Sequence, residues 1–280
     1  MKEEINMVKF KTEKISDRIT RIFAINSELM YLITGTNKAA IIDTGSGFGS
    51  LKNCVESLTD KPIIVLLTHG HIDHAMGAAE FNEVYMCRKD DYIYRIHSDE
   101  TIRKEGIKMS QEYDKLESTD YIPSAPIDFF KEIKEGDSFD LGGITIEIYS
   151  CPGHTKGSVV MLIKEERSLL LGDACNSFTF MFENYSTSIA EYEDSLKHLK
   201  LATDGKYDKV LASHDDGNLP INIIDSMIDL CEDIKDGNVD DIPFEFKGNK
   251  GYIAKEIKTP EMVRVDGRAG NIVYNKERVY

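Results

Sequence analysis

The strongest constraint on the fold is an apolar run at residues 62–67 that ends in a cluster of potential metal ligands. The run has the length of a typical strand and is rich in β-branched residues, which predicts a buried strand. Four potential ligands follow within six residues: His69, His71, Asp73 and His74. An extended segment presents the first three on one side because they alternate with other residues, whereas the fourth points elsewhere. The loop can therefore offer two nitrogens to one cation, and a carboxylate with a nitrogen to a second.

The number of histidines in this loop argues against a chance arrangement. The chain has seven histidines in 280 residues, and three of them lie in this one segment. A single loop histidine is more often a surface or core residue than a ligand. Three imidazoles beside a carboxylate, however, form a donor set that proteins use for zinc and related ions. The segment therefore predicts a metal site.

The overall charge and the cysteines limit the classes of partner. A net charge of −15, from 34 basic and 49 acidic residues, disfavours nucleic acid and anionic membranes as partners. No run approaches the ~18 apolar residues of a membrane-spanning helix, and the first residues show no signal-peptide pattern. The five cysteines lack CxxC and disulfide-framework spacing, which fits a reducing compartment. We expect a cytoplasmic protein that acts on a small molecule, with the oligomeric state open, a homodimer included.

Apolar runs and amphipathic segments alternate along the chain, which predicts an α/β fold. Strands are expected at 19–24, 29–34, 39–42, 144–149, 158–163, 168–171 and 209–212, and helices at 48–58, 189–201 and 221–235. The charged residues 88–120 predict a helical insertion, in which His97 is expected to be a surface histidine. Residues 243–280 predict a short β-rich tail. No low-complexity linker interrupts the chain, so a single domain over residues 1–280 is expected.

Other predicted strands also end at potential site residues. The strands at 144–149, 168–171 and 209–212 are each followed by a potential ligand: His154, Asp173 and His214. Sites of α/β proteins assemble at strand ends, so these residues are candidates to join the first cluster. Asp43 follows another strand and opens a glycine-rich turn that lacks the Gly-Lys-Ser/Thr of a phosphate-binding loop. We expect this acid to hold a tight turn near the site.

The segment after Asp173 is unusually aromatic. Its candidate pocket residues are Asn176, Phe178, Phe180, Phe182 and Tyr185. A solvated loop rarely holds three phenylalanines, so the segment either packs in the core or lines an apolar substrate pocket. Cys151 lies close to His154 in sequence and is an alternative soft ligand, but a small buried residue is the expected role.

Together these motifs resemble the metallo-β-lactamase superfamily, in the binuclear hydrolase branch that includes glyoxalase II-like thioesterases and lactonases. The matching pieces are Asp43, the HxHxDH motif at 69–74, Gly-His-Thr at 153–155, Gly172-Asp173 and Ser213-His214. The resemblance implies an αββα four-layer sandwich with two metal ions at one edge between two sheets. It implies that one ion is held by His69, His71 and His154, the other by Asp73, His74 and His214, and that Asp173 bridges them.

The chemistry expected of this site is metal-assisted hydrolysis. Three neutral imidazoles suit zinc, whereas the added carboxylates of the second site leave iron or manganese open. Two divalent ions lower the pKa of a bound water toward neutrality and give a hydroxide nucleophile. Asp73 and Asp173 can orient that nucleophile, and Asp43 supports the ligand loop from behind. We therefore expect a metal-dependent hydrolase that cleaves a small ester, thioester or lactone.

Two other activities of the same superfamily stay open. A phosphodiesterase could use the same ions on a small phosphodiester or nucleic acid, although the charge of −15 argues against long polyanions. An iron-dependent oxidoreductase is the second, although diiron members usually carry Glu where this chain has His71. Among hydrolases, lactonases often carry a tyrosine where this chain has Asn176, and the glutathione-recognising C-terminal region of glyoxalase II is not evident.

Overall fold

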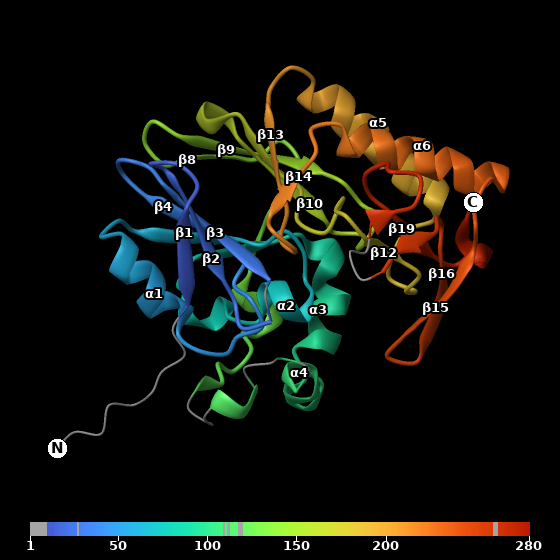
Figure 1. Cartoon of the computed structure of the whole chain (residues 1–280). Coiled ribbons are helices and arrows are strands. Elements are labelled where there is room, and N and C mark those ends of the chain that lie inside the picture. The colour runs from blue at the N-terminus through green and yellow to red at the C-terminus, as the bar shows by residue number, and fades with distance from the viewer. Residues whose placement is uncertain (1–9, 27, 109, 111–112, 117–119, 260–262) are drawn as a thin grey trace. The chain divides into compact units, whose positions relative to one another are not determined.

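The structure is a computed structural model that describes residues 10–26, 28–108, 110, 113–116, 120–259 and 263–280 (Figure 1). The backbone divides into two compact units. Unit 1 comprises residues 1–133 and 139–145, and unit 2 comprises residues 134–138 and 146–280. The single domain expected over residues 1–280 stays a prediction.

Unit 1 contains a seven-stranded sheet in the order β1-β2-β3-β4-β5-β6-β7. Its strands are β1 (Lys11–Lys14), β2 (Ile19–Phe23), β3 (Leu29–Thr34), β4 (Ala39–Ile42), β5 (Ile63–Leu66), β6 (Val84–Met86) and β7 (Lys131–Glu132). The first four strands are antiparallel, and β4 to β7 pair in parallel. The strand expected at 62–67 forms β5, where Val65 and Leu66 are fully buried. Because Ile42 of β4 pairs with Leu66 of β5, the residues that follow both strands emerge side by side.

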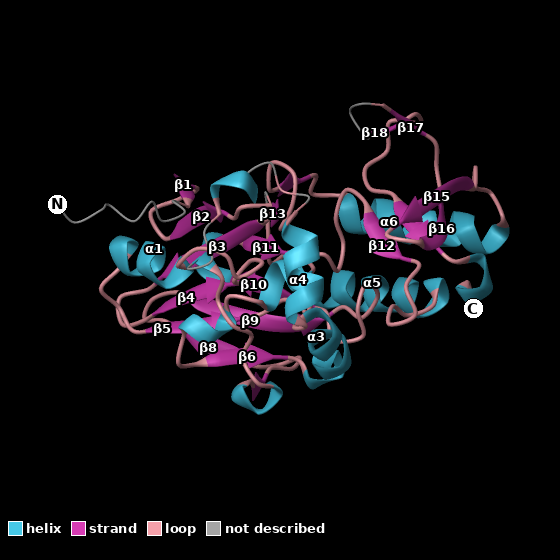
Figure 2. Ribbon diagram, turned by 90° about the horizontal axis from the view of Figure 1, so that it is seen from below, coloured by secondary structure: helices cyan, strands magenta, loops and turns pink. Residues whose placement is uncertain are grey.

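Four α-helices belong to unit 1 among the described residues: α1 (Leu51–Leu58), α2 (Ile72–Ala75), α3 (Asp91–His97) and α4 (Glu100–Ile107). α1 is the crossover that parallel β4 and β5 require, and the Ser50 side chain caps it by accepting from the Asn53 N–H. The expected insertion contains α3 and α4 (Figure 2), and its residues 109, 111–112 and 117–119 lie outside the described residues. The 3-10 turns are η1 (Ala78–Glu80), η2 (Arg88–Asp90), η3 (Tyr113–Lys115) and η5 (Ile127–Phe129).

The larger sheet of unit 2 runs in the order β14-β13-β11-β10-β9. Its strands are β9 (Thr145–Ser150), β10 (Val159–Ile163), β11 (Ser168–Leu170), β13 (Lys209–Leu211) and β14 (Asn218–Leu219), and β8 (Ser138–Asp140) lies at the chain boundary of the units. β11 and β13 are parallel and pair Leu170 with Leu211. The residues that follow these two strands therefore emerge at the same edge.

A smaller sheet of unit 2 runs in the order β12-β19-β16-β15. Its strands are β12 (Thr179–Met181), β15 (Ile242–Phe246), β16 (Asn249–Ile253) and β19 (Ile272–Tyr274), and β17 (Ile257–Lys258) pairs with β18 (Val263–Arg264). The β-rich tail expected at 243–280 thus supplies three of the four strands. The segment after the larger sheet's β11 supplies the fourth, β12, so the aromatic segment becomes part of this sheet.

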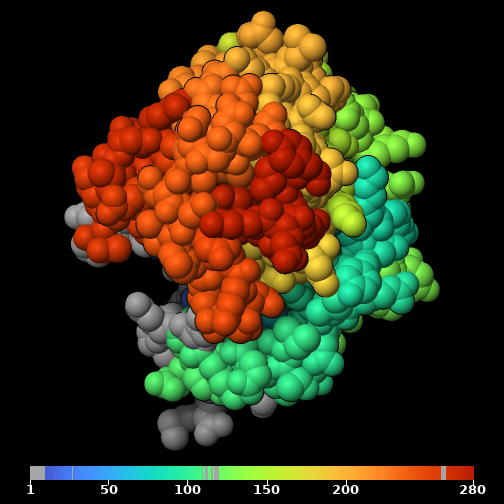
Figure 3. Space-filling model, turned by 90° about the vertical axis from the view of Figure 1, so that its right-hand side faces the viewer, coloured from blue at the N-terminus to red at the C-terminus, as the bar shows by residue number. Residues whose placement is uncertain are grey.

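The helices of unit 2 are α5 (Ile189–Thr203) and α6 (Ile223–Asp236), which lie side by side (Figure 1). α5 begins with a capping box between Ser188 and Glu191, and α6 ends at Gly237 in the left-handed conformation. Both helices bury apolar side chains in one core with β9, β10 and β11. Figure 3 shows the red C-terminal residues on the surface next to the orange residues around α6. The 3-10 turns are η6 (Lys164–Glu166) and η7 (Lys276–Arg278). Among the described residues, no helix has the length and apolar character that a membrane crossing needs.

Candidate metal centre

The ligand loop of unit 1 runs from the end of β5 into α2. Its four predicted ligands lie close together, and the three histidines are buried. The ring centroid of His69 is 4.6 Å from that of His71 and 4.1 Å from that of His74. The ligand atoms of His69 and His71 lie within 4.8 Å of one another, as do those of Asp73 and His74. The structure therefore presents two pairs of donors, whose binding of metal stays a prediction.

Asp43 organises this loop from the end of β4, where its carboxylate is buried. It accepts the Thr68 N–H at 2.7 Å, the Thr68 hydroxyl at 2.8 Å and the Nδ1–H of His74 at 2.8 Å. Because the single Thr68 hydroxyl hydrogen goes to the carboxylate, its oxygen accepts from Nδ1 of His69 at 3.0 Å. Both neutral rings then carry their proton on Nδ1 and an electron pair on Nε2. That tautomer is the one that a metal held by Nε2 requires.

The turn after Asp43 connects this acid to α2. Thr44 donates twice to the carbonyl of His74, from its backbone N–H at 2.7 Å and from its hydroxyl at 3.0 Å. Gly45 accepts the Met76 N–H at 3.0 Å. A side chain at Gly77 would meet the Thr44 carbonyl oxygen at 2.4 Å, so glycine is needed for this close approach. The expectation that Asp43 opens a tight turn near the ligand loop agrees with this geometry.

In unit 2 the three other predicted ligands lie around one carboxylate. Oδ2 of Asp173 is 3.2 Å from Nε2 of His214 and 3.8 Å from Nε2 of His154. The Nδ1–H of His154 donates to the Phe180 carbonyl of β12 at 2.7 Å, which leaves the electron pair on Nε2. The ring thus has the same tautomer as His69 and His74 of unit 1. The donor set of unit 2 fits a divalent cation by its chemistry, since it combines imidazole nitrogens with a shared carboxylate.

Close packing holds the turn that carries His154. A side chain at Gly153 would meet the ring of Tyr192 at 2.2 Å, and that ring is fully buried beneath the turn. The hydroxyl of Ser186 donates to the His154 carbonyl at 2.9 Å. The glycine of the Gly-His-Thr motif is therefore needed for contact with α5 rather than for a left-handed backbone.

The insertion supplies two contacts to the ligand loop that the sequence pattern does not predict. His97 was expected at the surface, but it is half-buried, its ring centroid is 4.9 Å from His71, and its Nδ1 accepts the Ile72 N–H at 3.2 Å. The surface expectation was wrong because the end of α3 returns beside the loop. Buried Asp90 accepts the Gly70 N–H at 2.9 Å. No spacing rule marks these residues, because both contacts join segments that are far apart along the chain.

Asn176, one of the predicted pocket residues, contacts the carboxylate of Asp173. It is buried, and its Nδ2 donates to Oδ1 of Asp173 at 3.3 Å. Its Oδ1 accepts the Phe178 N–H at 3.0 Å and the Thr179 hydroxyl at 3.1 Å. This amide therefore connects the carboxylate of Asp173 to the start of β12.

The predicted aromatic residues form a cluster in unit 2 with residues of the C-terminal tail. Phe182 is buried, whereas Phe178, Phe180 and Tyr185 are half-buried. Two half-buried rings of β15, Phe244 and Phe246, complete the cluster, with centroids 5.6 and 5.9 Å from Phe180. Phe180 is also the residue whose carbonyl accepts from His154. We name the five phenylalanines 178, 180, 182, 244 and 246 the phenylalanine cluster.

The cysteine beside His154 is a core residue. Cys151 is fully buried, and burial raises the pKa of its thiol well above the ordinary value. Burial likewise raises the pKa of Cys175 to about 12. A thiol held neutral in this way is a poor ligand, which agrees with the expected structural role of Cys151.

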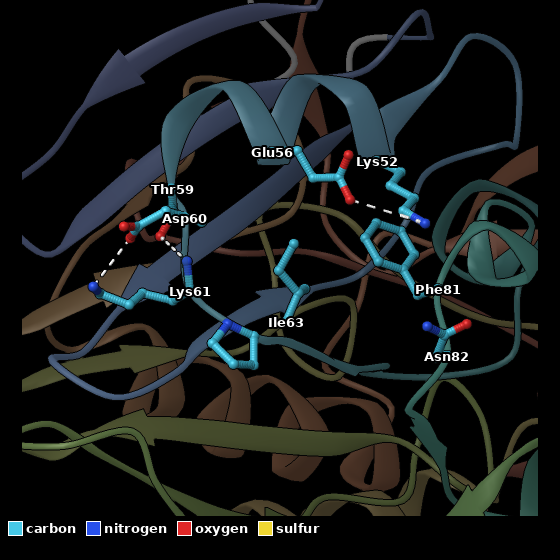
Figure 4. Close-up of a pocket in the computed structure, with 9 residues that line it drawn as sticks. Lys52, Glu56, Thr59, Asp60, Lys61, Ile63, Phe81 and Asn82 are labelled. Carbon is cyan, nitrogen blue, oxygen red and sulfur yellow. Dashed lines mark hydrogen bonds and ion pairs between the residues drawn. The ribbon is translucent and has the colours of Figure 1, made fainter.

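The cavity drawn in Figure 4 lies at the amino end of β5, whereas the ligand loop follows the carboxyl end. It encloses about 340 Å³ and is lined by Lys52, Glu56, Thr59, Asp60, Lys61, Pro62, Ile63, Phe81 and Asn82. The charged residues pair with one another, Lys52 with Glu56 at 3.9 Å and Lys61 with Asp60 at 3.0 Å. The cavity contains none of the predicted ligands and has no unbalanced charge.

Comparison with known proteins defines the class of this chain. The sequence model of the metallo-beta-lactamase superfamily matches residues 26–214. The chain therefore belongs to the metallo-β-lactamase superfamily. A metallo-beta-lactamase from Pontibacter korlensis superposes with a TM-score of 0.55 at 15% identity, over 79% of this chain and 98% of that one. The resemblance and the predicted fold class, the α/β sandwich of this superfamily, are confirmed.

The chain is also similar to two curated proteins over part of its length. An uncharacterized protein of Mycobacterium tuberculosis (strain ATCC 25618 / H37Rv) is 33% identical over 153 residues, which cover 51% of this chain and 62% of that protein. The human acyl-coenzyme A thioesterase MBLAC2 is 22% identical over 212 residues, which cover 68% of this chain and 73% of that protein. The match thus spans less than two thirds of the mycobacterial relative.

Proposed function

We propose that this chain is a metal-dependent hydrolase with a binuclear centre that cleaves a small ester, thioester or lactone. The observation that carries the proposal is the common tautomer of His69, His74 and His154. In each ring a protein oxygen accepts the hydrogen bond from Nδ1, so Nε2 keeps the electron pair that can bind a metal. Histidines that serve only as core residues have no need of this shared arrangement.

The proposed allotment follows the two donor pairs of unit 1 and the carboxylate of unit 2. One ion is held by His69, His71 and His154, the second by Asp73, His74 and His214, and Asp173 serves both. Zinc is the expected metal, with iron or manganese as the alternatives. When bound, two such ions polarise the scissile carbonyl and supply a water of lowered pKa.

The chain's own groups then orient the reactants. Asp73 and Asp173 accept hydrogen bonds from the attacking water, and Asn176 holds the carboxylate of Asp173 through its Nδ2 donor. Asp43 keeps the rings of His69 and His74 in one orientation. The proposal needs no serine or cysteine nucleophile, which agrees with the neutral, buried thiol of Cys151.

The phenylalanine cluster supports an acyl substrate with an apolar chain. Four of its five rings are half-buried, and all five belong to unit 2. The backbone carbonyl of Phe180 accepts a hydrogen bond from the proposed ligand His154. The acyl-coenzyme A thioesterase among the relatives favours a thioester over the other two classes. Asn176, which stands where lactonases often carry tyrosine, is engaged with Asp173 and argues in the same direction.

The test is a substrate panel with metal-loaded protein. We expect turnover of acyl thioesters to exceed turnover of lactones and of a chromogenic phosphodiester, and to vanish in His71→Ala. His198→Ala is the matched control, since His198 is an exposed histidine paired with Glu135. Faster cleavage of the phosphodiester would replace the proposal with the phosphodiesterase alternative. Iron in protein purified without added metal, together with oxygen uptake, would replace it with the oxidoreductase alternative.

A further inference from the structure

In the ligand loop, residues whose side chains are proposed ligands alternate with residues whose backbone N–H groups are held by the insertion. His69, His71 and Asp73 are the proposed ligands, and the two residues between them donate their N–H groups to the insertion. The Gly70 N–H donates to Oδ2 of Asp90 at 2.9 Å, and the Ile72 N–H donates to Nδ1 of His97 at 3.2 Å. One side of the loop therefore carries ligands and the other side carries anchors.

Asp90 is built for this contact. Its residue is 1% exposed, although a buried carboxylate is costly unless its hydrogen-bonding capacity is used. A side chain at Gly70 would lie 3.1 Å from Cβ and from the carbonyl oxygen of Asp90. The glycine of the HxH motif thus lets the carboxylate reach the backbone, and a hydrogen bond to an ionised acceptor is stronger than a neutral one.

His97 accepts through Nδ1, so a neutral ring carries its proton on Nε2. The Nδ1 atom is therefore occupied by the loop and is not a metal donor. The centroids of the His97 and His71 rings are 4.9 Å apart, and the ring planes meet at an angle of 49°. The hydrogen bond from Ile72 therefore holds the backbone directly after the proposed ligand His71.

Arg103 of α4 holds the neighbouring turn. The residue is 1% exposed, and its guanidinium donates to the carbonyls of Ser46 and Gly47 at 3.1 and 3.2 Å. It also lies 4.4 Å from the ring centroid of Tyr121. The turn that Arg103 holds follows Asp43, and its Thr44 donates two hydrogen bonds to the carbonyl of His74.

We propose that Asp90 and His97 are positioning residues, whose acceptor atoms hold the 69–74 loop in the conformation that binds metal. The insertion then acts as a support of the metal centre, with Arg103 securing the adjacent turn. The inference rests on the proposed function in one respect, namely that the loop binds metal. It adds an anchor for each N–H between the ligands.

The experiment distinguishes the two nitrogens of His97. In His97→Asn the amide oxygen stands about where Nδ1 stands, because both are two bonds from Cβ. In His97→Gln the terminal amide stands about where Nε2 stands. We expect zinc affinity, measured by competition with a chromophoric chelator, to stay near wild type in His97→Asn and to fall about 10–100-fold in His97→Gln and His97→Phe.

The same logic applies to Asp90, since Asp90→Asn keeps an oxygen acceptor and Asp90→Leu removes it. Thermal unfolding of the metal-free proteins checks that each variant folds, and Arg95→Ala on the exposed side of α3 is the control for that helix. Equal zinc affinity in all variants, or retention in His97→Gln with loss in His97→Asn, would overturn the inference. A wild-type protein that binds no zinc would instead overturn the proposed function.

Discussion

The two units hold their proposed ligands in different ways. Unit 1 presents four ligands on one continuous loop, and side chains brought from other segments, Asp43, Asp90 and His97, accept its hydrogen bonds. Unit 2 takes one ligand from each of three separate strand ends. Its His154 is held by a backbone carbonyl, and the parallel register of β11 and β13 brings Asp173 and His214 together. Side chains therefore position the first set, whereas sheet geometry, together with the Asn176 amide on Asp173, positions the second.

This difference has a consequence for mutation. A support made of a side chain can be removed by one substitution, whereas a support made of a strand register or a carbonyl cannot. Unit 1 should therefore be sensitive at residues that are not ligands. Unit 2 should be sensitive mainly at the ligands themselves, at Asn176 and at positions where the backbone packs closely.

The largest effect is expected at Asp173, which is the only carboxylate among the proposed ligands of unit 2. Asp173→Ala removes the group that lies beside both His154 and His214. Loss of a residue that merely orients a ligand lowers metal affinity or activity about 10–100-fold. Loss of a shared ligand should cost more, so we expect kcat/KM to fall by more than about 100-fold and the metal content to drop. Kinetic assays and elemental analysis measure both quantities. Asp194→Ala, an exposed acid on α5, is the control. Full metal content with normal turnover would contradict the shared role.

A smaller effect is expected at Asp43, and its variants test whether side chains position unit 1. Asp43→Ala removes the acceptor of His74 and the acceptor of the Thr68 hydroxyl that orders His69. We expect zinc affinity to fall about 10–100-fold. Asp43→Asn should lie between this variant and wild type, because one amide oxygen cannot serve both partners.

Spectra of the cobalt-loaded protein give a second measurement for Asp43. A ring that turns or changes its tautomer alters the ligand field, whereas a loss of stability alone leaves the spectrum of the folded protein unchanged. Wild-type affinity and an unchanged spectrum in Asp43→Ala would remove the proposed difference between the units.

The same difference explains how far the sequence predicts the site. The ligands of unit 1 were recognisable because they lie within one short segment, and those of unit 2 because each lies in the turn after an apolar strand. Of their supports, Asp43 was recognisable because it directly follows a predicted strand. Asp90 and His97 were not, since they lie far along the chain from the loop and meet it only in the folded protein. The charge pattern of that segment predicts a solvated helix. Such a pattern does not reveal that one ring of the segment, His97, contacts the ligand loop.

The fold shows a similar limit. The alternating pattern predicts the strands and helices well, and the buried run at 62–67 forms β5 as expected. The aromatic segment was ambiguous between core and pocket, because its partners lie far along the chain. Phe244 and Phe246 join it only through the sheet order β12-β19-β16-β15, which no local pattern encodes.

The smallest effect on chemistry is expected at Gly153, where unit 2 should be sensitive through its backbone. Gly153→Ala places a methyl group 2.2 Å from the ring of Tyr192, which is fully buried and donates its hydroxyl to the Ala174 carbonyl at 2.7 Å. Overpacking of this kind costs about 1–3 kcal/mol, so the free energy of unfolding should fall by that amount. The turn must also shift, which moves His154 but leaves the side-chain supports of unit 1 in place. Denaturant unfolding measures the stability, and zinc competition should show one weakened ion and one that is nearly unaffected. Equal weakening of both ions would mean that the two sets of ligands depend on each other more closely than their separate supports imply.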